Sequence, residues 1–387
     1  MARLPTRPSI LNVFSSFAVG GPQVRFTRLA AHLGDRFRHA VIAMDGDYTC
    51  RSRVDPALDI TYPEVSFTKG RTVANIMHFR KRLRELGPDI LVTNNWGSIE
   101  WSVANAIPIA RHIHIEDGFG PEERDAQLSR RIWARRIFLR RSTVVVPSLT
   151  LQRIATEKWR LPAECVKYIP NGIDCARFAQ RTGRMSWPGD GPVIGTVAAL
   201  RPEKNLPRLL HAFRLAARRQ PARLIIVGDG PELASLQQLA AELELAGRVH
   251  FAGATATPEA YYPGFDIFAL SSDTEQMPLS VLEAMAAGLP IVATDVGDVA
   301  SMVAAENDRF VFGREASLLA QNLQTLVSDA DLRRRLGEAN QVKAFQCYSE
   351  AEMHKAYSRL LEAPVWTRLV AGLMRDCDVQ TGPVRNA

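Results

Sequence analysis

The chain has 387 residues, of which 46% are hydrophobic and 23% charged, and this composition predicts a globular protein of two or three domains. It has no run of about 18 uncharged apolar residues and no N-terminal apolar segment suited to a secretory signal, so we expect a cytoplasmic protein without a membrane-spanning helix. The net charge of +7 comes from residues 1–170, where 26 Lys and Arg stand against 16 Asp and Glu (the remainder has 22 against 25), which predicts an anionic partner.

Short β-branched runs alternate with helical patterns along the whole chain, which predicts a doubly wound α/β architecture. In the first half, the predicted strands are 9–14, 40–44, 90–93, 113–115 and 143–146, and the predicted helices are 22–33, 73–86 and 127–141. In the second half, the predicted strands are 193–197, 224–227, 249–251, 267–270 and 291–293, and the predicted helices are 206–219, 232–243, 279–287, 317–329, 332–345 and 350–361.

Residues 177–192 are rich in Gly, Pro, Arg and Ser and separate the two series, which indicates a linker. We therefore predict two Rossmann-like lobes, at 1–176 and 177–345. The segment 346–387 is predicted to contribute a helix that crosses back to the first lobe, followed by a tail after residue 364. Ligands of such folds bind at the carboxyl ends of the strands, so the lobes are expected to face a central cleft.

The most informative segment is 274–290, where Glu275 and Glu283 lie eight residues apart. A Met-Pro pair between them is a natural helix entry, and it leaves the amides of Leu279 and Ser280 as an anion site suited to a diphosphate. Glu283, one turn into that helix, can accept hydrogen bonds from ribose hydroxyls. Glu275 precedes the helix and is expected to face a sugar. The alternative is a solvated helix start with ordinary capping glutamates.

These two glutamates, followed by Ala-Met-Ala-x-Gly-x-Pro-Ile-Val-Ala-Thr, resemble the family-4 glycosyltransferases. Three further segments resemble the family's motifs in the expected order, and they are 169–178, 195–205 and 227–232. The resemblance covers the second half almost continuously. It implies a GT-B fold and the transfer, with retention, of a hexose-type sugar from a nucleotide diphosphate sugar to an acceptor.

The resemblance assigns the second lobe to the donor and the first to the acceptor. Arg201 and Lys204 follow a strand end, and together they would neutralise the departing diphosphate. Gly228 and Gly230 are expected beside the donor ribose and base. A dinucleotide fingerprint is not expected there, because the third glycine is missing. The donor sugar is assigned to Glu275, Gln276, Met277 and Pro278.

The first half offers further candidates for the same site. Gly20 and Gly21 follow the first strand and open a helix, a position that the family uses near the donor phosphate or the acceptor. Many family members place a histidine immediately before a glycine, to contact the donor sugar, within the stretch equivalent to 111–123. Here Asp117 has that place and His114 lies three residues earlier. Both stay candidates with Glu275 for the catalytic group, and we favour Asp117.

Acceptor contacts are expected from Asn94, Asn95 and Glu116, at strand ends of the first lobe, although turn formation explains the asparagines equally well. We expect no metal or other cofactor. The five cysteines are scattered, and Asp45-Gly46-Asp47 is predicted to be a surface turn.

Residues 124–141 carry seven arginines among Ile, Trp, Phe and Leu. We expect an amphipathic helix that packs its apolar stripe on the first lobe and carries arginines along its flanks. The alternative is a surface that rests on anionic lipid headgroups, as a protein peripheral to the inner face of the cytoplasmic membrane would need. Nucleic acid is not expected as a partner, because a known binding module is absent.

A glycan or glycolipid acceptor, such as a lipid-linked intermediate of polysaccharide or lipopolysaccharide synthesis, fits the basic first lobe. Competing functions are a GT-B epimerase, a phosphorylase, a dinucleotide oxidoreductase and a non-catalytic sensor of nucleotide sugars. The sensor is suggested by the aspartate at the usual histidine position. A phosphorylase would need a cofactor lysine or an orthophosphate pocket that the sequence does not indicate.

Overall fold

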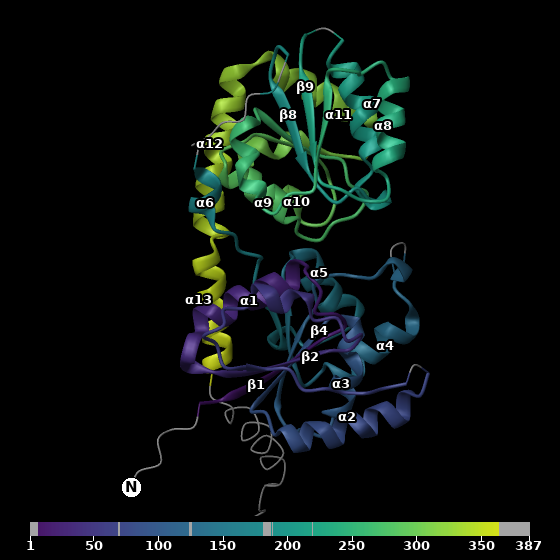
Figure 1. Ribbon diagram of the computed structural model, residues 1–387, viewed down its shortest axis with the longest axis vertical. Coiled ribbons are helices and arrows are strands. Elements are labelled where there is room, and N and C mark those ends of the chain that lie inside the picture. Colours follow the sequence, from purple (N-terminus) through teal and green to yellow (C-terminus); the bar gives the residue numbers. More distant parts are fainter. Residues whose placement is uncertain are drawn as a thin grey trace, which may run out of the picture. The chain divides into compact units, whose positions relative to one another are not determined.

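The computed structural model describes residues 7–68, 70–123, 126–180, 187, 189–218 and 220–363 (Figure 1). Two parallel sheets form its framework, with strand orders β3-β2-β1-β4-β5-β6-β7 and β10-β9-β8-β11-β12-β13. Both orders reverse direction next to their first strand, as in doubly wound nucleotide-binding folds. The predicted pair of Rossmann-like sheets is confirmed. The predicted linker lies partly, and the tail after residue 364 wholly, outside the described residues.

The seven strands of the first sheet are β1 (Ser9–Phe14), β2 (Arg38–Ala43), β3 (Ile60–Thr61), β4 (Ile90–Asn94), β5 (Arg111–Ile115), β6 (Thr143–Val146) and β7 (Val166–Tyr168). The helices in this part of the chain are α1 (Gly21–Leu33), α2 (Thr72–Leu86), α3 (Ile99–Ala104), α4 (Ser129–Phe138), α5 (Leu149–Arg153) and α6 (Cys175–Ala179).

The six strands of the second sheet are β8 (Val193–Val197), β9 (Arg223–Val227), β10 (Val249–Gly253), β11 (Ile267–Leu270), β12 (Ile291–Thr294) and β13 (Val311–Phe312). The accompanying helices are α7 (Leu206–Ala216), α8 (Leu233–Glu242), α9 (Leu279–Ala286), α10 (Val299–Met302), α11 (Ala316–Ser328), α12 (Ala330–Cys347) and α13 (Glu350–Glu362). Strands β3, β7 and β13 were not predicted, because two or three residues at a sheet edge are too few to show a period.

Alternate residues of the central strands enter opposite cores of each sheet. In β9, Leu224 and Ile226 pack with α7, α8 and α11, whereas Ile225 and Val227 pack with α9 and α10. In β1, Val13 packs with Phe79 of α2. Strands covered by helices on both faces read as continuous apolar runs, which is why the central strands were predictable from the sequence.

The chain divides into two compact units, and the division passes through α13. Among the described residues, the first unit holds 7–116, 133–144 and 355–363, and the second holds 117–132 and 145–354. The end of α13 is bound within the first unit, where the Arg111 guanidinium donates to the carbonyls of Leu360, Leu361 and Ala363. The last helix thus starts in the second unit and ends in the first, as predicted. No helix in the described part of the chain is both long and apolar enough to cross a lipid bilayer.

The arginine-rich helix α4 corrects the sequence prediction. Arg131 and Arg135 are buried, with exposed fractions of 6% and 0%, whereas Trp133 and Ile137 are 57% and 59% exposed. A buried guanidinium needs a countercharge. Arg131 and Arg135 point inward because carboxylates lie there. The partners are Glu122 and Glu123 for Arg131, and Glu116 for Arg135.

Candidate functional site

Lys204 and Glu275 form an ion pair in the second unit, just after the adjacent strands β8 and β11. The ammonium nitrogen of Lys204 lies 2.6 Å from Glu275 Oε1, which also accepts a hydrogen bond of 2.8 Å from the Ser272 hydroxyl. The side chains are 23% and 11% exposed. The carboxyl ends of parallel strands lie at the same edge of a sheet. Lys204 and Glu275 are distant in sequence, and they meet because each follows one of two adjacent strands.

A second set of polar contacts ties the same two loops. The Asp273 amide donates to the carbonyl of Glu203 over 2.8 Å, and the Asp273 carboxylate accepts hydrogen bonds from Arg208 at 2.7 Å and from Asn205 at 3.1 Å. Burial disfavours the charged form of Asp273, but the bonds from Arg208 and Asn205 outweigh burial and lower its pKa. Asn205 has a left-handed backbone (φ 44°), which ends the short turn at Lys204 and caps α7.

The start of α9 has the predicted open amides. Pro278 precedes the helix with an extended backbone and supplies no side-chain cap. Leu279 and Ser280 follow, and their amides have no acceptor in the part of the chain that the structure describes. One turn later, Glu283 accepts a hydrogen bond of 2.6 Å from the hydroxyl of Tyr262, whose ring is fully buried. Burial, and then the Glu283 carboxylate, raise the pKa of Tyr262 well above its usual value, so Tyr262 stays a donor.

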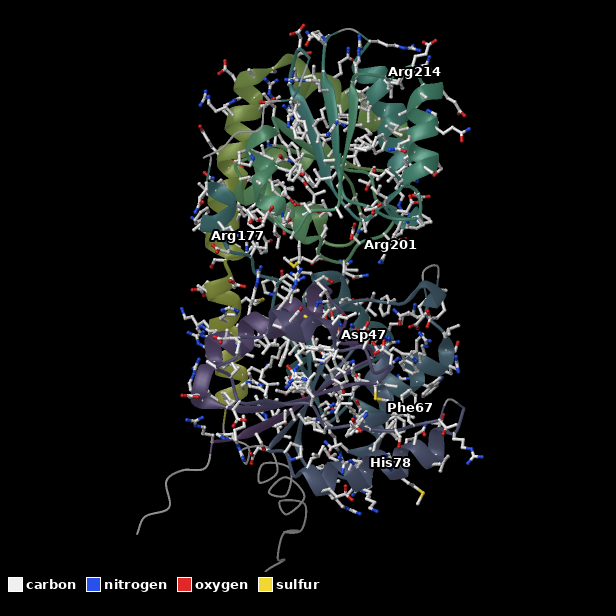
Figure 2. All side chains as sticks on the ribbon, in the orientation of Figure 1. Asp47, Phe67, His78, Arg177, Arg201 and Arg214 are labelled. Atoms are coloured by element: carbon white, nitrogen blue, oxygen red, sulfur yellow. The ribbon has the colours of Figure 1, made fainter. Side chains whose placement is uncertain are left out.

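Arg201 is exposed, and its guanidinium has no hydrogen-bond or ion-pair partner among the described residues. It precedes the turn that ends at Lys204, and Figure 2 shows it at the opposite end of the second unit from Arg214. An exposed guanidinium without a partner among the described residues, three residues from the partly buried ammonium of Lys204, is suited to a doubly charged anion.

The two glycines after β9 are required by the chain itself. A Cβ at Gly228 (φ 141°) would lie 1.8 Å from the carbonyl oxygen of Ala198, and one at Gly230 would lie 2.5 Å from that of Leu200. We expected these glycines to let the backbone approach a ribose or base. The close approach in the structure is to the loop that follows β8, the loop that continues to Arg201.

The residues around Gln276 link the glutamate motif to the Asp117 turn within the second unit. A Cβ at Gly118, immediately after Asp117, would lie 3.2 Å from Cγ of Gln276. The Gln276 carbonyl accepts from the Asp298 amide at 2.9 Å, and Met277 Sδ accepts from the Asn171 amide at 3.3 Å. The structure therefore brings the Asp117–Gly118 turn beside the predicted sugar-contact segment.

The remaining candidates lie in the first unit. Gly20 caps α1 with an extended backbone, Gly21 begins the helix, and the first turn of α1 carries no acidic residue, so its positive end is unneutralised. Asn94 is buried and donates to the carbonyl of Val13 at 3.1 Å. Asn95 has a positive φ of 56°, and its amide donates to the carbonyl of Ile115 at 2.8 Å.

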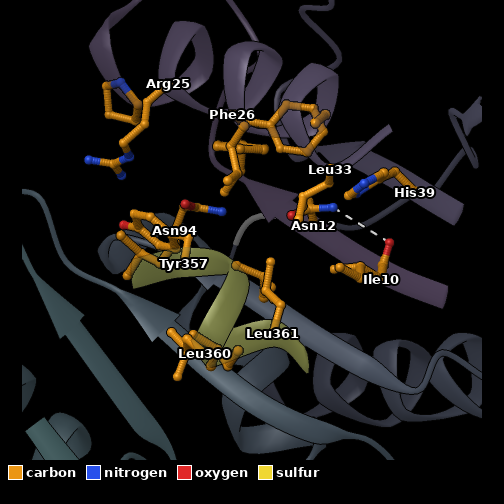
Figure 3. A pocket seen from close by; sticks show the side chains of 17 residues that line it. Ile10, Asn12, Arg25, Phe26, Leu33, His39, Asn94, Tyr357, Leu360 and Leu361 are labelled. Carbon is orange, nitrogen blue, oxygen red and sulfur yellow. Dashed lines mark hydrogen bonds between the residues drawn. The ribbon is translucent and has the colours of Figure 1, made fainter. Parts of the chain in front are cut away.

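A cavity of about 40 Å³ lies beneath α1, beside the end of α13 (Figure 3). Apolar side chains form most of its lining, and Asn12, His39 and Asn94 are the polar groups contributed by the strands. Neither ring nitrogen of His39 has a hydrogen-bond partner in the part of the chain that the structure describes. Burial lowers the pKa of His39 to about 4, against a smaller opposing effect of Asp59.

His114 and Glu116 are fully buried in the first unit. His114 Nδ1 lies 2.8 Å from the Thr93 hydroxyl, and His114 Nε2 lies 3.4 Å from Glu116 Oε2. The same oxygen accepts a hydrogen bond of 2.9 Å from Arg135 Nε. Because neither side chain has any exposed surface, His114 and Glu116 do not contact a ligand directly in this structure, and they act on it only by positioning other residues. Asp117, which is partly exposed, is the catalytic candidate of this segment that can contact a ligand.

Sequence reasoning missed four residues that organise the site, and they are Ser272, Tyr262, Asp273 and Arg208. Ser272 and Asp273 directly precede the glutamate motif, so an extension of that motif by three residues would have included them. Tyr262 and Arg208 had no such signal, because their partners are distant in sequence.

Comparisons with known proteins are consistent with this geometry. The family described as "Glycosyltransferase Family 4" matches residues 19–177, and that described as "Glycosyl transferases group 1" matches residues 183–343. A lipopolysaccharide core biosynthesis glycosyltransferase of Rhizobium meliloti is 31% identical over 212 residues, 54% of this chain and 61% of that protein. A GDP-mannose-dependent phosphatidylinositol monomannoside mannosyltransferase of Mycobacterium tuberculosis is 32% identical over 267 residues, 65% of this chain and 63% of that protein.

The chain thus matches somewhat less than two thirds of the length of these curated relatives. Among solved structures, Anabaena HepE in complex with UDP-glucose superposes with a TM-score of 0.74 at 21% identity, covering 92% of this chain and 100% of that one. This likeness establishes the GT-B fold. With both of its halves matched, the chain belongs to the family-4 glycosyltransferases.

Proposed function

We propose that this protein is a retaining glycosyltransferase that moves a hexose-type sugar from a nucleotide diphosphate sugar to a glycan or glycolipid acceptor. The observation that supports the proposal most is the set of anion-binding groups gathered in the second unit. Among the described residues, Lys204 pairs with Glu275, Arg201 has no partner, and the first amides of α9 have no acceptor. Such groups stabilise the negative charge that grows on a departing diphosphate.

The candidates that can reach a ligand have the following roles in this proposal. Arg201, Lys204 and the amides of Leu279 and Ser280 bind the diphosphate, while Glu283, oriented by Tyr262, accepts hydrogen bonds from the ribose. The segment from Glu275 to Pro278 and the carboxylate of Asp117 contact the sugar. In the first unit, we assign the Gly20–Gly21 turn to the phosphates and Asn95, which is partly exposed, to the acceptor, whereas Asn94 is buried and bonded to Val13. No metal is needed in this scheme, because the two cations supply the countercharge.

Retention requires that the new bond forms on the face from which the old bond leaves. In the proposed step, the bond between the anomeric carbon and the phosphate oxygen breaks, and the bond to the acceptor oxygen forms on the same side. The acceptor hydroxyl transfers its proton to the departing phosphate oxygen, so no separate carboxylate base is required. Proton NMR of the product, which distinguishes its anomers, tests this part of the proposal.

The donor assignment is tested by thermal unfolding with a panel of UDP- and GDP-sugars, because a ligand at 100 times its Kd stabilises a protein by about 2.7 kcal/mol. Release of nucleoside diphosphate from the stabilising sugar supports a transferase. Stabilisation without any release favours the sensor, and an absence of stabilisation by every nucleotide sugar contradicts both.

The exposed face of α4 supports an anionic membrane surface as a further partner. Trp133 and Ile137, one turn apart, are both more than half exposed, and the Arg136 guanidinium lies 5.0 Å from the Trp133 ring centre. Aromatic and aliphatic groups among arginines suit the headgroup region of a bilayer, and so we propose a peripheral location on the inner face of the cytoplasmic membrane. Co-sedimentation with phosphatidylglycerol vesicles should be lost in Trp133→Ser/Ile137→Ser, and equal binding by this variant would contradict the proposal.

A further inference from the structure

A chain of hydrogen bonds passes through two histidines in the first unit. It joins side chains from β4, β5, α4 and the residue before β6, and its contacts lie between 2.6 and 3.4 Å. In order, these contacts are Ser142 Oγ to His112 Nδ1, His112 Nε2 to Thr93 Oγ1, Thr93 Oγ1 to His114 Nδ1, His114 Nε2 to Glu116 Oε2, and Glu116 Oε2 to Arg135 Nε.

The direction of every hydrogen bond follows from the charge at one end. Arg135 is fully buried and permanently charged, so the adjacent Glu116 is its carboxylate countercharge, and a carboxylate only accepts. His114 Nε2 must therefore donate, and an imidazole with a single N–H that donates from Nε2 accepts at Nδ1. A hydroxyl has one proton, and Thr93 donates it to His114 Nδ1. Thr93 Oγ1 must therefore accept its hydrogen bond from His112.

The same logic determines the second ring. His112 Nε2 donates to Thr93, and His112 Nδ1 accepts from the Ser142 hydroxyl. Ser102 Oγ, 3.3 Å from Thr93 Oγ1, can fill the second lone pair of that hydroxyl. Burial, followed by the neighbouring His114, lowers the pKa of His112 to about 3, so this ring is neutral near pH 7.

We propose that the Glu116–Arg135 pair sets the imidazoles of His112 and His114 in the Nε2–H tautomer through Thr93. The resulting row of hydrogen bonds holds the backbone at Asp117 in position. This role rests on the proposed function only in that Asp117 contacts the sugar. Glu116, His114 and Thr93 are then positioning residues that do not themselves contact the ligand.

The position of Glu116 explains how this row of hydrogen bonds is connected to Asp117. β5 ends at Ile115, Glu116 follows at once, and Asp117 and Gly118 come next, outside the strand. The second oxygen of Glu116, Oε1, is buried without a hydrogen-bond partner among the described residues, so within this part of the chain Arg135 and His114 are the groups that orient the carboxylate. The Arg135 guanidinium also lies 5.0 Å from the ring centre of Trp96, after the end of β4. One arginine thus joins α4 to the ends of two adjacent strands.

NMR of protein labelled with ¹⁵N-histidine tests the tautomers without any substrate. We expect His112 and His114, assigned from His112→Gln and His114→Gln, both as Nε2–H rings near pH 7. In Glu116→Leu/Arg135→Leu, which removes both charges together and so leaves no buried charge unpaired, both rings should gain Nδ1–H population. Glu116→Gln keeps an oxygen acceptor and should keep both tautomers. A wild-type His114 in the Nδ1–H form, or an unchanged His112 in the double variant, would overturn the relay.

Two further measurements test positioning. In the double variant, hydrogen exchange of amides 116–120 should accelerate, and release of nucleoside diphosphate from the donor should slow about tenfold in kcat with KM within about twofold. Glu116→Gln should lose less of this rate. Unchanged exchange at 116–120 would overturn the positioning role. If the wild-type protein shows no donor turnover, the proposed function fails, while NMR and hydrogen exchange still decide this inference.

Discussion

Glu275 holds Lys204 by an ion pair of 2.6 Å that spans 71 residues of sequence, and Arg201, three residues earlier, is exposed. The paired ammonium is fixed in place by the carboxylate, whereas the guanidinium has solvent around it. We expect an incoming diphosphate to meet one preorganised cation and one that adapts to it. The two cations should therefore contribute differently to binding.

Removal of either cation should weaken nucleotide binding. Arg201→Ala and Lys204→Ala should each raise the Kd of the nucleoside diphosphate about 10- to 100-fold, as expected for the loss of a charge-assisted hydrogen bond. Isothermal titration calorimetry measures this change. Arg214→Ala, at the other end of the second unit, removes the same charge and is the matched control. Equal affinities in all four proteins would exclude the proposed diphosphate site.

Neutralising Glu275 should separate binding from turnover. Glu275→Gln keeps the shape but removes a negative charge beside the diphosphate, so nucleotide affinity should stay equal or rise. Turnover should fall on the order of 100-fold, because the group that we assign to the sugar is lost. Steady-state kinetics and titration of the diphosphate measure the two effects. A variant that loses affinity and keeps kcat would reverse this assignment.

Loss of the Tyr262 hydroxyl should weaken the binding of the ribose but leave the binding of the phosphates unchanged. Tyr262→Phe removes the 2.6 Å hydrogen bond to Glu283, which leaves that carboxylate less well oriented. Binding of the nucleoside diphosphate should weaken about 3- to 10-fold, whereas binding of inorganic pyrophosphate should not change. If pyrophosphate binding falls equally, the effect belongs to the fold of α9 and not to ribose recognition.

Gly228 should tolerate no side chain. Gly228→Ala would place Cβ 1.8 Å from a backbone oxygen, and we expect the free energy of unfolding to fall by about 3 kcal/mol or more. Gly247 also has a positive φ, of 76°, but nothing lies within 4 Å of its added Cβ. Gly247→Ala should therefore cost only the backbone term of about 1–2 kcal/mol. Urea unfolding of the two variants measures the difference, and equal losses would show that the close approach is unimportant.

His39 should make the protein less stable in mild acid. Its pKa is about 4 in the folded protein and about 6.5 when unfolded, so the unfolded chain binds the proton first as the pH falls. The resulting loss of stability starts near pH 6.5, reaches about 2 kcal/mol at pH 5 and is complete near pH 4. Urea unfolding at pH 7.5 and 5.0 should show this loss in the wild type and a smaller loss in His39→Gln. The same loss of stability in both proteins would show that a group other than His39 causes the acid sensitivity.

Much of the proposed donor site could be suggested from the sequence because its residues are concentrated in short segments. Arg201, Lys204 and the motif from Glu275 to Glu283 stand at strand or helix ends, where the backbone itself determines their direction. The helix 127–141 was predictable as a helix, but its orientation was not. The carboxylates that draw Arg131 and Arg135 inward come from other segments, and hydrophobic periodicity does not register such pairs.

The sequence by itself determined the two doubly wound sheets and the candidate anion site, because periodicity, strand ends and helix entries are local properties of the chain. Only the tertiary structure decided that Glu275 pairs with Lys204, that Tyr262 orients Glu283, and that Glu116 is buried against Arg135. Those contacts join residues from 19 to 71 positions apart, and their formation depends on which strands become neighbours in the sheet.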